Sequence, residues 1–175
     1  MKKSLLVLML VLPLFAVALK AQKFGHINSQ ELIMKMPEME AALASLEDLQ
    51  TSNNERLKLM QDELQRLNAE YVQARKTLDA ITRQTREAEL QKMNQNIQGF
   101  YQTAQEDMKT KQQELTEPII EKARKAVETV GKEQGLLYVF DVSKGEVLYM
   151  GAQSLDLFPI VAKKLGIIID AAAVQ

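Results

Sequence analysis

Groups that could carry out nucleophilic or metal chemistry are scarce in this sequence. Its 175 residues include one histidine, His26, and no cysteine. A Ser-His-Asp triad or a zinc site requires a histidine or a thiolate beside further reactive groups. We therefore interpret His26 as a structural residue and expect no metal site. Without cysteine, neither a disulfide nor thiolate chemistry can contribute.

The acidic residues and glycines also fail to form a recognisable catalytic pattern. No Glu-x-x-His arrangement occurs, so the many carboxylates are interpreted as solvated helix faces. No glycine lies between Gly25 and Gly99, and the stretch 131–135 lacks the spacing of a phosphate-binding loop. The sequence predicts that the protein is not an enzyme, holds no cofactor and does not use ATP.

The residue types that remain suit binding better than catalysis. Methionine side chains are flexible and fit surfaces that must accept many sequences. At helical spacing they can instead pack between two helices, and this alternative stays open. Phe100 and Tyr101 are adjacent and face different directions, and Phe100 fits the expected helix contact. The residues that we expect to contact a bound partner are Tyr101, Met108, Met60 and Met93.

The first 21 residues have the features of a secretory signal. Lys2 and Lys3 precede an apolar stretch from Leu5 to Leu19, and small residues follow. The mature chain would then begin near Gln22. An uncleaved membrane anchor is the alternative, although this stretch is shorter than the roughly 20 residues that span a bilayer.

Composition and charge limit the size of the core and the kind of partner. Aromatic residues make up 5% of the chain, charged residues make up 26%, and tryptophan is absent. Such a composition favours long helices over a large globular core. Without residues 1–21 the chain has 19 basic and 23 acidic side chains, a net charge of −4. This balance argues against a nucleic-acid partner.

Two long helices are predicted from apolar residues that recur in steps of three and four. The first series runs from Met39 to Ile81, and Gln50 and Asn53 interrupt it with polar side chains. Such an interruption either loosens a helix contact or fixes its register. The second series runs from Leu90 to Val130.

The connections of these helices follow from capping and breaking residues. A turn is expected within 78–87, with Thr85 capping the second helix. Pro118 would either kink that helix or end it. Gly135 is expected to stop it.

The remaining segments predict a small sheet. The segments 136–142 and 146–150 are expected to form an antiparallel strand pair, which the strand 23–28 could join. Asp156 would cap a short helix that ends at Gly166.

The predicted fold class is therefore α+β, mostly α, with a long antiparallel helical hairpin on a small β body. The expected division is a signal peptide over 1–21, a hairpin over 37–134, and a body formed by 22–36 and 135–175.

This order of elements is accompanied by several short motifs. They are Phe24-Gly25-His26-Ile27-Asn28, Glu117-Pro118-Ile119, Leu137-Tyr138-Val139-Phe140-Asp141, Leu155-Asp156-Leu157 and Lys163-Lys164-Leu165-Gly166-Ile167. In this order, the elements and motifs make the chain resemble the Skp/OmpH family of periplasmic chaperones.

The resemblance implies a homotrimer located in the periplasm. Strands of three protomers would form a central body, and three hairpins would project from it as tentacles around a cavity. Such a protein holds unfolded outer-membrane β-barrel proteins without ATP and prevents their aggregation. The residues expected in the trimer body are Phe24, Ile27, Leu137, Val139 and Phe140.

Two questions remain open at this stage. The predicted hairpin turn carries a local net charge of +2, which indicates either a weak contact with a membrane surface or a solvated face. The alternative function is a structural coiled-coil spacer or adaptor of the cell envelope that binds a folded partner.

Overall fold

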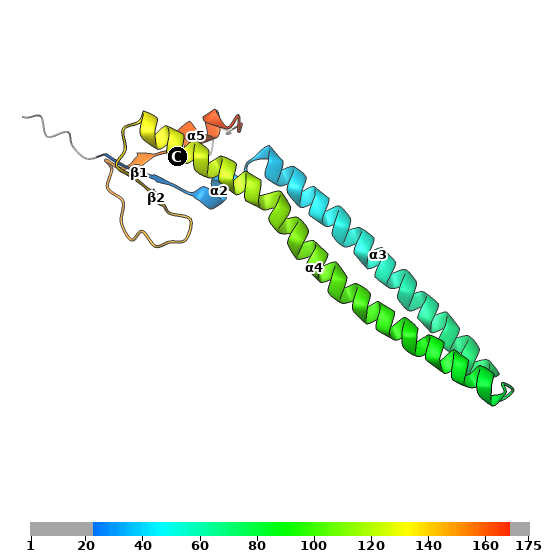
Figure 1. The fold of residues 1–175 in the computed structure, drawn as a ribbon. Helices are drawn as coiled ribbons and strands as arrows, with labels where there is room; N and C mark the ends of the chain where they lie inside the picture. Colours follow the sequence, from blue (N-terminus) through cyan, green and yellow to red (C-terminus); the bar gives the residue numbers. More distant parts are fainter. Residues whose placement is uncertain (1–22, 169–175) are drawn as a thin grey trace, which may run out of the picture. The chain divides into compact units, whose positions relative to one another are not determined.

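The computed structural model describes residues 23–168, so the predicted signal peptide lies outside the described residues. The chain is mostly helical, with a long helix pair and a small sheet, which confirms the predicted fold class. It divides into two compact units, one containing residues 23–29 and 126–168 and the other residues 30–125. The elements are β1 (Phe24–Ile27), α2 (Ser29–Met34), α3 (Pro37–Ala74), α4 (Ala80–Glu133), β2 (Tyr138–Asp141), β3 (Leu155–Asp156) and α5 (Phe158–Lys164) (Figure 1).

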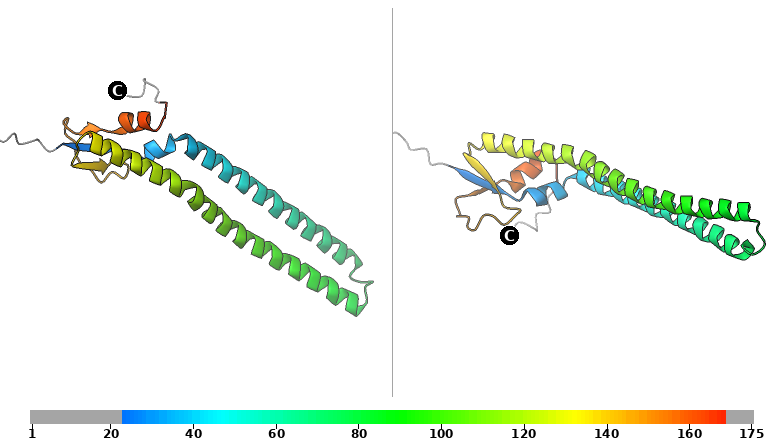
Figure 2. Two further views of the ribbon diagram at one scale, coloured as in Figure 1. Left: turned by 45° about the horizontal axis from the view of Figure 1, so that its top comes forward. Right: turned by 60° about the horizontal axis from the view of Figure 1, so that its bottom comes forward.

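The helical hairpin consists of α3 and the part of α4 up to Lys125. The two helices run side by side in opposite directions in both views of Figure 2. Tyr71 of α3 donates a hydrogen bond to Glu87 of α4, and Lys122 of α4 pairs with Glu38 of α3. These contacts lie toward opposite ends of the hairpin. Residues of both predicted apolar series, among them Leu57, Leu90 and Phe100, line grooves between α3 and α4, so the series mark the faces by which the two helices meet.

The turn between these helices lies earlier in the chain than the sequence predicted. Ile81 was expected in the first helix but belongs to α4, where its side chain is 78% exposed. Asp79, not Thr85, caps α4: its carboxylate accepts the N–H groups of Ile81 and Thr82 at 3.0 and 2.9 Å. The Thr85 hydroxyl bonds to the Ile81 carbonyl within the helix. A carboxylate at this position also suits the positive end of the helix dipole, which explains why Asp79 prevails.

Pro118 lies inside α4, so the helix does not end there. It continues to Glu133 and is stopped by Gly135, whose φ of +64° suits a residue without a Cβ. Beyond the last turn, the Leu136 N–H donates to the Gly131 carbonyl and the Gly135 N–H donates to the Lys132 carbonyl. These two bonds form a Schellman end, which confirms the predicted helix stop.

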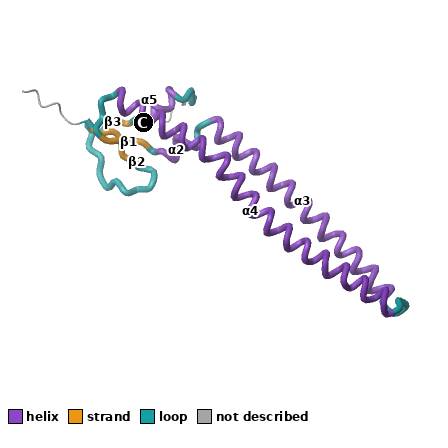
Figure 3. The backbone as a smooth tube through the Cα atoms, in the orientation of Figure 1, coloured by secondary structure: helices purple, strands orange, loops and turns teal. Residues whose placement is uncertain are grey.

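The small sheet differs from the predicted antiparallel pair. Its order is β2-β1-β3 (Figure 3). Both pairings are parallel. The segment 146–150 was expected to be a strand but forms none, and the third strand is β3 instead. Alternating apolar residues indicate a strand without identifying its partner. Here the segment 142–154 leads from β2 to the opposite edge of β1.

The start of α2 is tied to the end of β2. The Ser29 hydroxyl donates to Asp141 at 2.5 Å, and the Ser29 N–H also donates to Asp141. Asp141 accepts the Ser143 N–H as well. Burial raises the pKa of Asp141, but these hydrogen bonds outweigh that effect, and the pKa lies below its ordinary value.

The core of the β-containing unit depends on a close approach at Gly25. Along β1, Gly25 and Ile27 are buried while Phe24 and His26 face the other side. A Cβ on Gly25 would lie 2.4 Å from Leu157 Cδ1 and 2.7 Å from Leu136 Cδ1. Only glycine lets these leucines pack directly on the strand backbone.

Replacing this glycine should destabilise the protein. We expect Gly25→Ala to lower the free energy of unfolding by about 1–3 kcal/mol, the usual cost of overpacking. Gly99→Ala is the matched control, because a Cβ at this position of α4 would meet no atom within 4 Å beyond its chain neighbours and the backbone of its own helix. There, alanine should stabilise the helix by about 0.5–1 kcal/mol. Urea unfolding of both variants tests this, and equal effects would contradict the packing described for Gly25.

Candidate functional site

The contact between the two helices is unevenly buried along the hairpin. Full burial occurs at its open end, where Met39, Ala42, Ile119 and Ala123 are 3–5% exposed. Between Leu46 and Leu115, by contrast, every seam residue keeps part of its side chain in contact with solvent. A pair of helices has only one contact face each, so most of the hairpin cannot enclose a core.

Several large apolar side chains of the hairpin also point away from this contact. Leu59 is 69% exposed and Val72 is 62% exposed. Single exposed apolar residues are common, but here they accompany a contact that is itself half open. The hairpin therefore offers apolar surface along much of its length. The exposed large apolar residues of the hairpin helices are Leu43, Leu59, Val72, Ile81, Tyr101 and Ile120.

The four residues predicted to contact a partner fall into two groups. Tyr101 is 53% exposed on α4, as expected for a binding residue. Met60, Met93 and Met108 are half-buried along the helix contact. The structure brings Tyr101 and Met108 together in one groove, whereas Met60 and Met93 lie outside it. Their role in binding remains a prediction.

The groove that holds Tyr101 and Met108 lies between α3 and α4, about midway along the hairpin. It has a volume of about 340 Å³. At its position the polar pair Gln50 and Asn53 interrupts the apolar series of α3. We call it the mid-hairpin groove, and its lining residues are Leu46, Gln50, Asn53, Asn54, Leu57, Phe100, Tyr101, Ala104, Gln105, Met108, Lys109 and Gln112.

Sequence reasoning missed most of this groove, although one signal pointed to it. The interruption at Gln50 and Asn53 was interpreted as loosening the contact or fixing its register. The structure shows a groove at this place, as loosening would produce. Arg56 of α3 stands over the Phe100 ring of α4, with its guanidinium carbon 4.9 Å from the ring centroid. This cation–π contact adds a weak attraction between the helices beside the groove.

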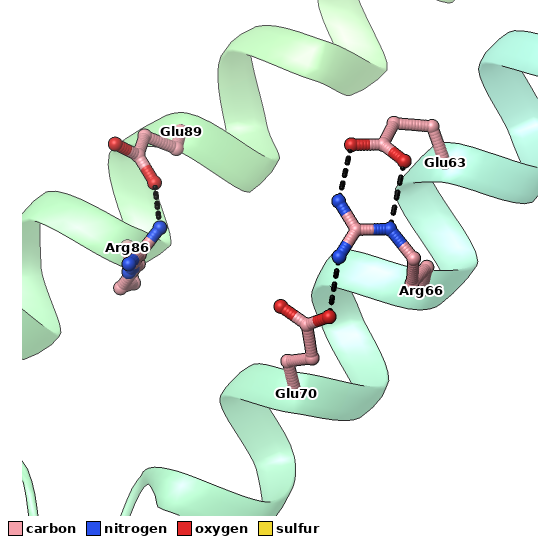
Figure 4. Close-up of polar contacts among 5 residues, drawn as sticks. All are labelled: Glu63, Arg66, Glu70, Arg86 and Glu89. Atoms are coloured by element: carbon pink, nitrogen blue, oxygen red, sulfur yellow. Dashed lines mark hydrogen bonds and ion pairs between the residues drawn. The ribbon is translucent and has the colours of Figure 1, made fainter.

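Charged side chains of the hairpin pair mainly along each helix. Figure 4 shows Arg66 between Glu63 and Glu70 on α3, and Arg86 beside Glu89 on α4. Hydrogen bonding from Arg66 lowers the pKa of Glu63. Because these pairs are exposed, each adds little to stability. They do not balance the charge of α3 as a whole, which carries eight acidic and three basic side chains.

Two contacts across the hairpin also shift acid–base equilibria. The hydrogen bond to Glu87 raises the pKa of Tyr71, and the hydrogen bond from Lys122 lowers the pKa of Glu38. At the turn, Arg75, Lys76 and Arg83 are exposed. The weak membrane contact and the solvated face are both still predictions for this cationic turn.

The β-containing unit exposes an aromatic face on its sheet. Parallel register places Phe24 beside Tyr138, and the rings of Phe24, Tyr138 and Phe140 lie with centroids 6.2–6.3 Å apart. All three side chains are exposed, with Tyr138 at 60%. We call these three residues the aromatic face. Tyr138 was missed by sequence reasoning because the strand partner had been predicted wrongly.

The predicted trimer-body residues are distributed over both faces of this sheet. Phe24 and Phe140 belong to the aromatic face, Leu137 is exposed and Val139 is half-buried. Ile27, however, is 2% exposed and packs inside the protomer. An interface through the aromatic face would therefore not include Ile27.

His26 makes a structural contact on the exposed side of β1. Its Nδ1 lies 2.9 Å from the Ser154 hydroxyl, which connects β1 to the segment before β3. Within residues 23–168, no cluster of three acidic or histidine side chains could hold a metal ion. Over the same residues, no helix combines the length and apolarity needed to cross a membrane.

The fold is similar to that of a solved OmpH-like protein. That protein comes from Caulobacter crescentus CB15, and its structure was determined by crystallography. It is described as a candidate outer membrane chaperone. The two chains superpose with a TM-score of 0.72 at 16% sequence identity, over 82% of this chain and 83% of the other. A search of curated proteins gives no significant match.

The family is established by the sequence itself. The model of the family described as outer membrane protein (OmpH-like) matches residues 23–165. The match spans both compact units, from β1 to the residue after α5. The chain therefore belongs to the OmpH-like family.

Proposed function

We propose that the protein is an ATP-independent holding chaperone of the periplasm that binds unfolded outer-membrane β-barrel proteins and prevents their aggregation. The observation that carries this proposal is the half-open helix contact between Leu46 and Leu115, flanked by exposed apolar side chains. Membership of the OmpH-like family supports a chaperone role in general. The periplasmic location rests on the predicted signal peptide and on the family.

The physical basis for holding is the sum of many weak contacts. An unfolded β-barrel protein presents apolar side chains along an extended chain, and the hairpin presents apolar surface along its length. Each contact is weak and exchanges readily, but several hairpins on one client raise the local concentration of binding sites. Release then needs only a more favourable alternative, such as folding of the client. No energy source is required.

Such avidity requires several hairpins in one assembly, and we propose a homotrimer. The aromatic face supports self-association, because three adjacent exposed rings cost free energy in water and aromatic residues are enriched at interfaces. The face lies on a sheet whose outer strands, β2 and β3, each pair with β1 alone among the described strands. Burial of the rings between protomers would remove them from solvent.

A structural spacer is the competing function, and the hairpin contact bears on it. A rigid spacer would gain stiffness from a closely packed helix contact. Here the middle of the contact is half open and includes a groove. This arrangement favours a binding surface over a rigid rod.

Light scattering tests the holding function directly. A urea-unfolded outer-membrane β-barrel protein is diluted into buffer without ATP, with rising amounts of the mature protein. We expect scattering to fall and to reach its minimum near one trimer per client. An equal mass of a soluble helical protein is the control. Unchanged scattering from a folded, helical sample would contradict the proposal and leave the spacer function.

The proposed assembly has its own test. Replacing Tyr138 and Phe140 by Asp should shift the protein from trimer to monomer in sedimentation velocity, because truncated aromatic anchors typically cost at least about 2 kcal/mol each at an interface. The matched control replaces Leu59 and Val72 of α3 by Asp, which makes the same chemical change away from the sheet. A Tyr138→Asp, Phe140→Asp protein that still sediments as a trimer would exclude the aromatic face as the interface.

A further inference from the structure

The mid-hairpin groove differs chemically from the rest of the hairpin surface. Its floor is apolar and its sides carry the neutral amide side chains of glutamine and asparagine, whereas the helices elsewhere are rich in charged residues. Lys109 is the one charged residue among those that line it. The amide residues of the lining are Gln50, Asn53, Asn54, Gln105 and Gln112.

Most of these amides have unused hydrogen-bonding capacity. The Gln50 side chain donates a hydrogen bond to the Asn54 side chain at 3.1 Å. This is the one side-chain hydrogen bond among the five amide residues of the groove. Asn53, Gln105 and Gln112 make no hydrogen bond through their side chains to any residue in the described part of the chain. Each primary amide offers two donors and two acceptor lone pairs. The groove therefore presents a set of neutral donors and acceptors above an apolar floor.

This pattern matches the chemistry of an extended polypeptide main chain. Every peptide group offers one N–H and one C=O, and both need partners when water is displaced. A carboxamide side chain can meet both at once, and it does so regardless of the sequence of the bound chain. The apolar floor, which includes Leu46 and Leu57, can accept a client side chain at the same time.

We infer that the mid-hairpin groove is a subsite that binds the extended main chain of an unfolded client through its amide side chains. The inference rests on the proposed holding function and specifies where and how part of the client is held. The groove also accounts for the position of Tyr101, which lines it while remaining more than half exposed. There its ring can pack on a bound chain while its hydroxyl remains hydrated.

The polar residues weaken the hairpin itself, which argues for a role outside folding. Apolar side chains at positions 50 and 53 would continue the apolar series of α3 and fill the groove. The double variant Gln50→Leu, Asn53→Leu should therefore unfold at a higher temperature than the natural protein. Polar residues that lower the stability of a helix contact are expected where function requires them.

The same double variant tests the subsite. Fluorescence anisotropy measures its affinity for a labelled, urea-unfolded outer-membrane β-barrel protein, with the full mature assembly. Loss of one or two main-chain hydrogen bonds at about 1 kcal/mol each should weaken binding about five- to thirtyfold. The control variant Gln61→Leu, Gln65→Leu makes the same change on the exposed face of α3, outside the groove. It should bind as the natural protein does.

A second measurement decides the question even if the leucine variant fails to fold. A photoreactive phenylalanine analogue is placed at Gln105 in the groove or at Gln95, which is exposed on α4 outside it. Strong crosslinking to the client from position 105 and weak crosslinking from position 95 would support the subsite. Equal affinity of the folded leucine variant, or absence of crosslinks at 105, would overturn it. A natural protein that does not bind the client at all would instead contradict the holding function.

Discussion

The parallel arrangement of the sheet is the constraint on which the rest of the structure depends. A parallel strand pair cannot be joined by a tight turn, so the chain between β1 and β2 has to form a crossover. In this protein the crossover consists of α2, α3 and α4, and the two long helices form the hairpin. The close approach at Gly25 and the hydrogen bonds of Asp141 hold the strands that begin and end this excursion. One small packed unit thus anchors a long element that has little core of its own.

The partial burial of the hairpin follows from its geometry and links it to the proposed function. Each helix contacts one neighbour, so the apolar contact between them stays half open except at the end near Met39 and Ile119. An enclosed core would be more stable but would leave no apolar surface for a client. The polar residues Gln50 and Asn53 have the same effect, because a groove for a client lies where apolar side chains would otherwise pack. Stability is concentrated at one end of the hairpin, and binding capacity lies along the remainder.

The sequence predicted the helices well because their signal is local and repeated. A series of apolar residues from Met39 onward and a glycine stop at Gly135 define the helices without reference to distant residues. The turn was placed too late because Asp79 and Thr85 can both cap a helix, and the stronger cap, the carboxylate of Asp79, was overlooked. The sheet was predicted with the wrong partner for β2, since strand pairing depends on contacts between distant segments. For the same reason Tyr138 and most of the mid-hairpin groove became visible only in the structure.

The central claim is that the half-open middle of the hairpin is the surface that holds unfolded clients. Hydrogen–deuterium exchange of the mature assembly, with and without an unfolded outer-membrane β-barrel protein, tests it most directly. Without client, amides around Met39–Ala42 and Ile119–Ala123 should exchange more slowly than those between Leu46 and Leu115, because local stability follows burial. With client, exchange in that middle region should slow. Uniform protection along the hairpin, unchanged by a client that demonstrably binds, would contradict the account.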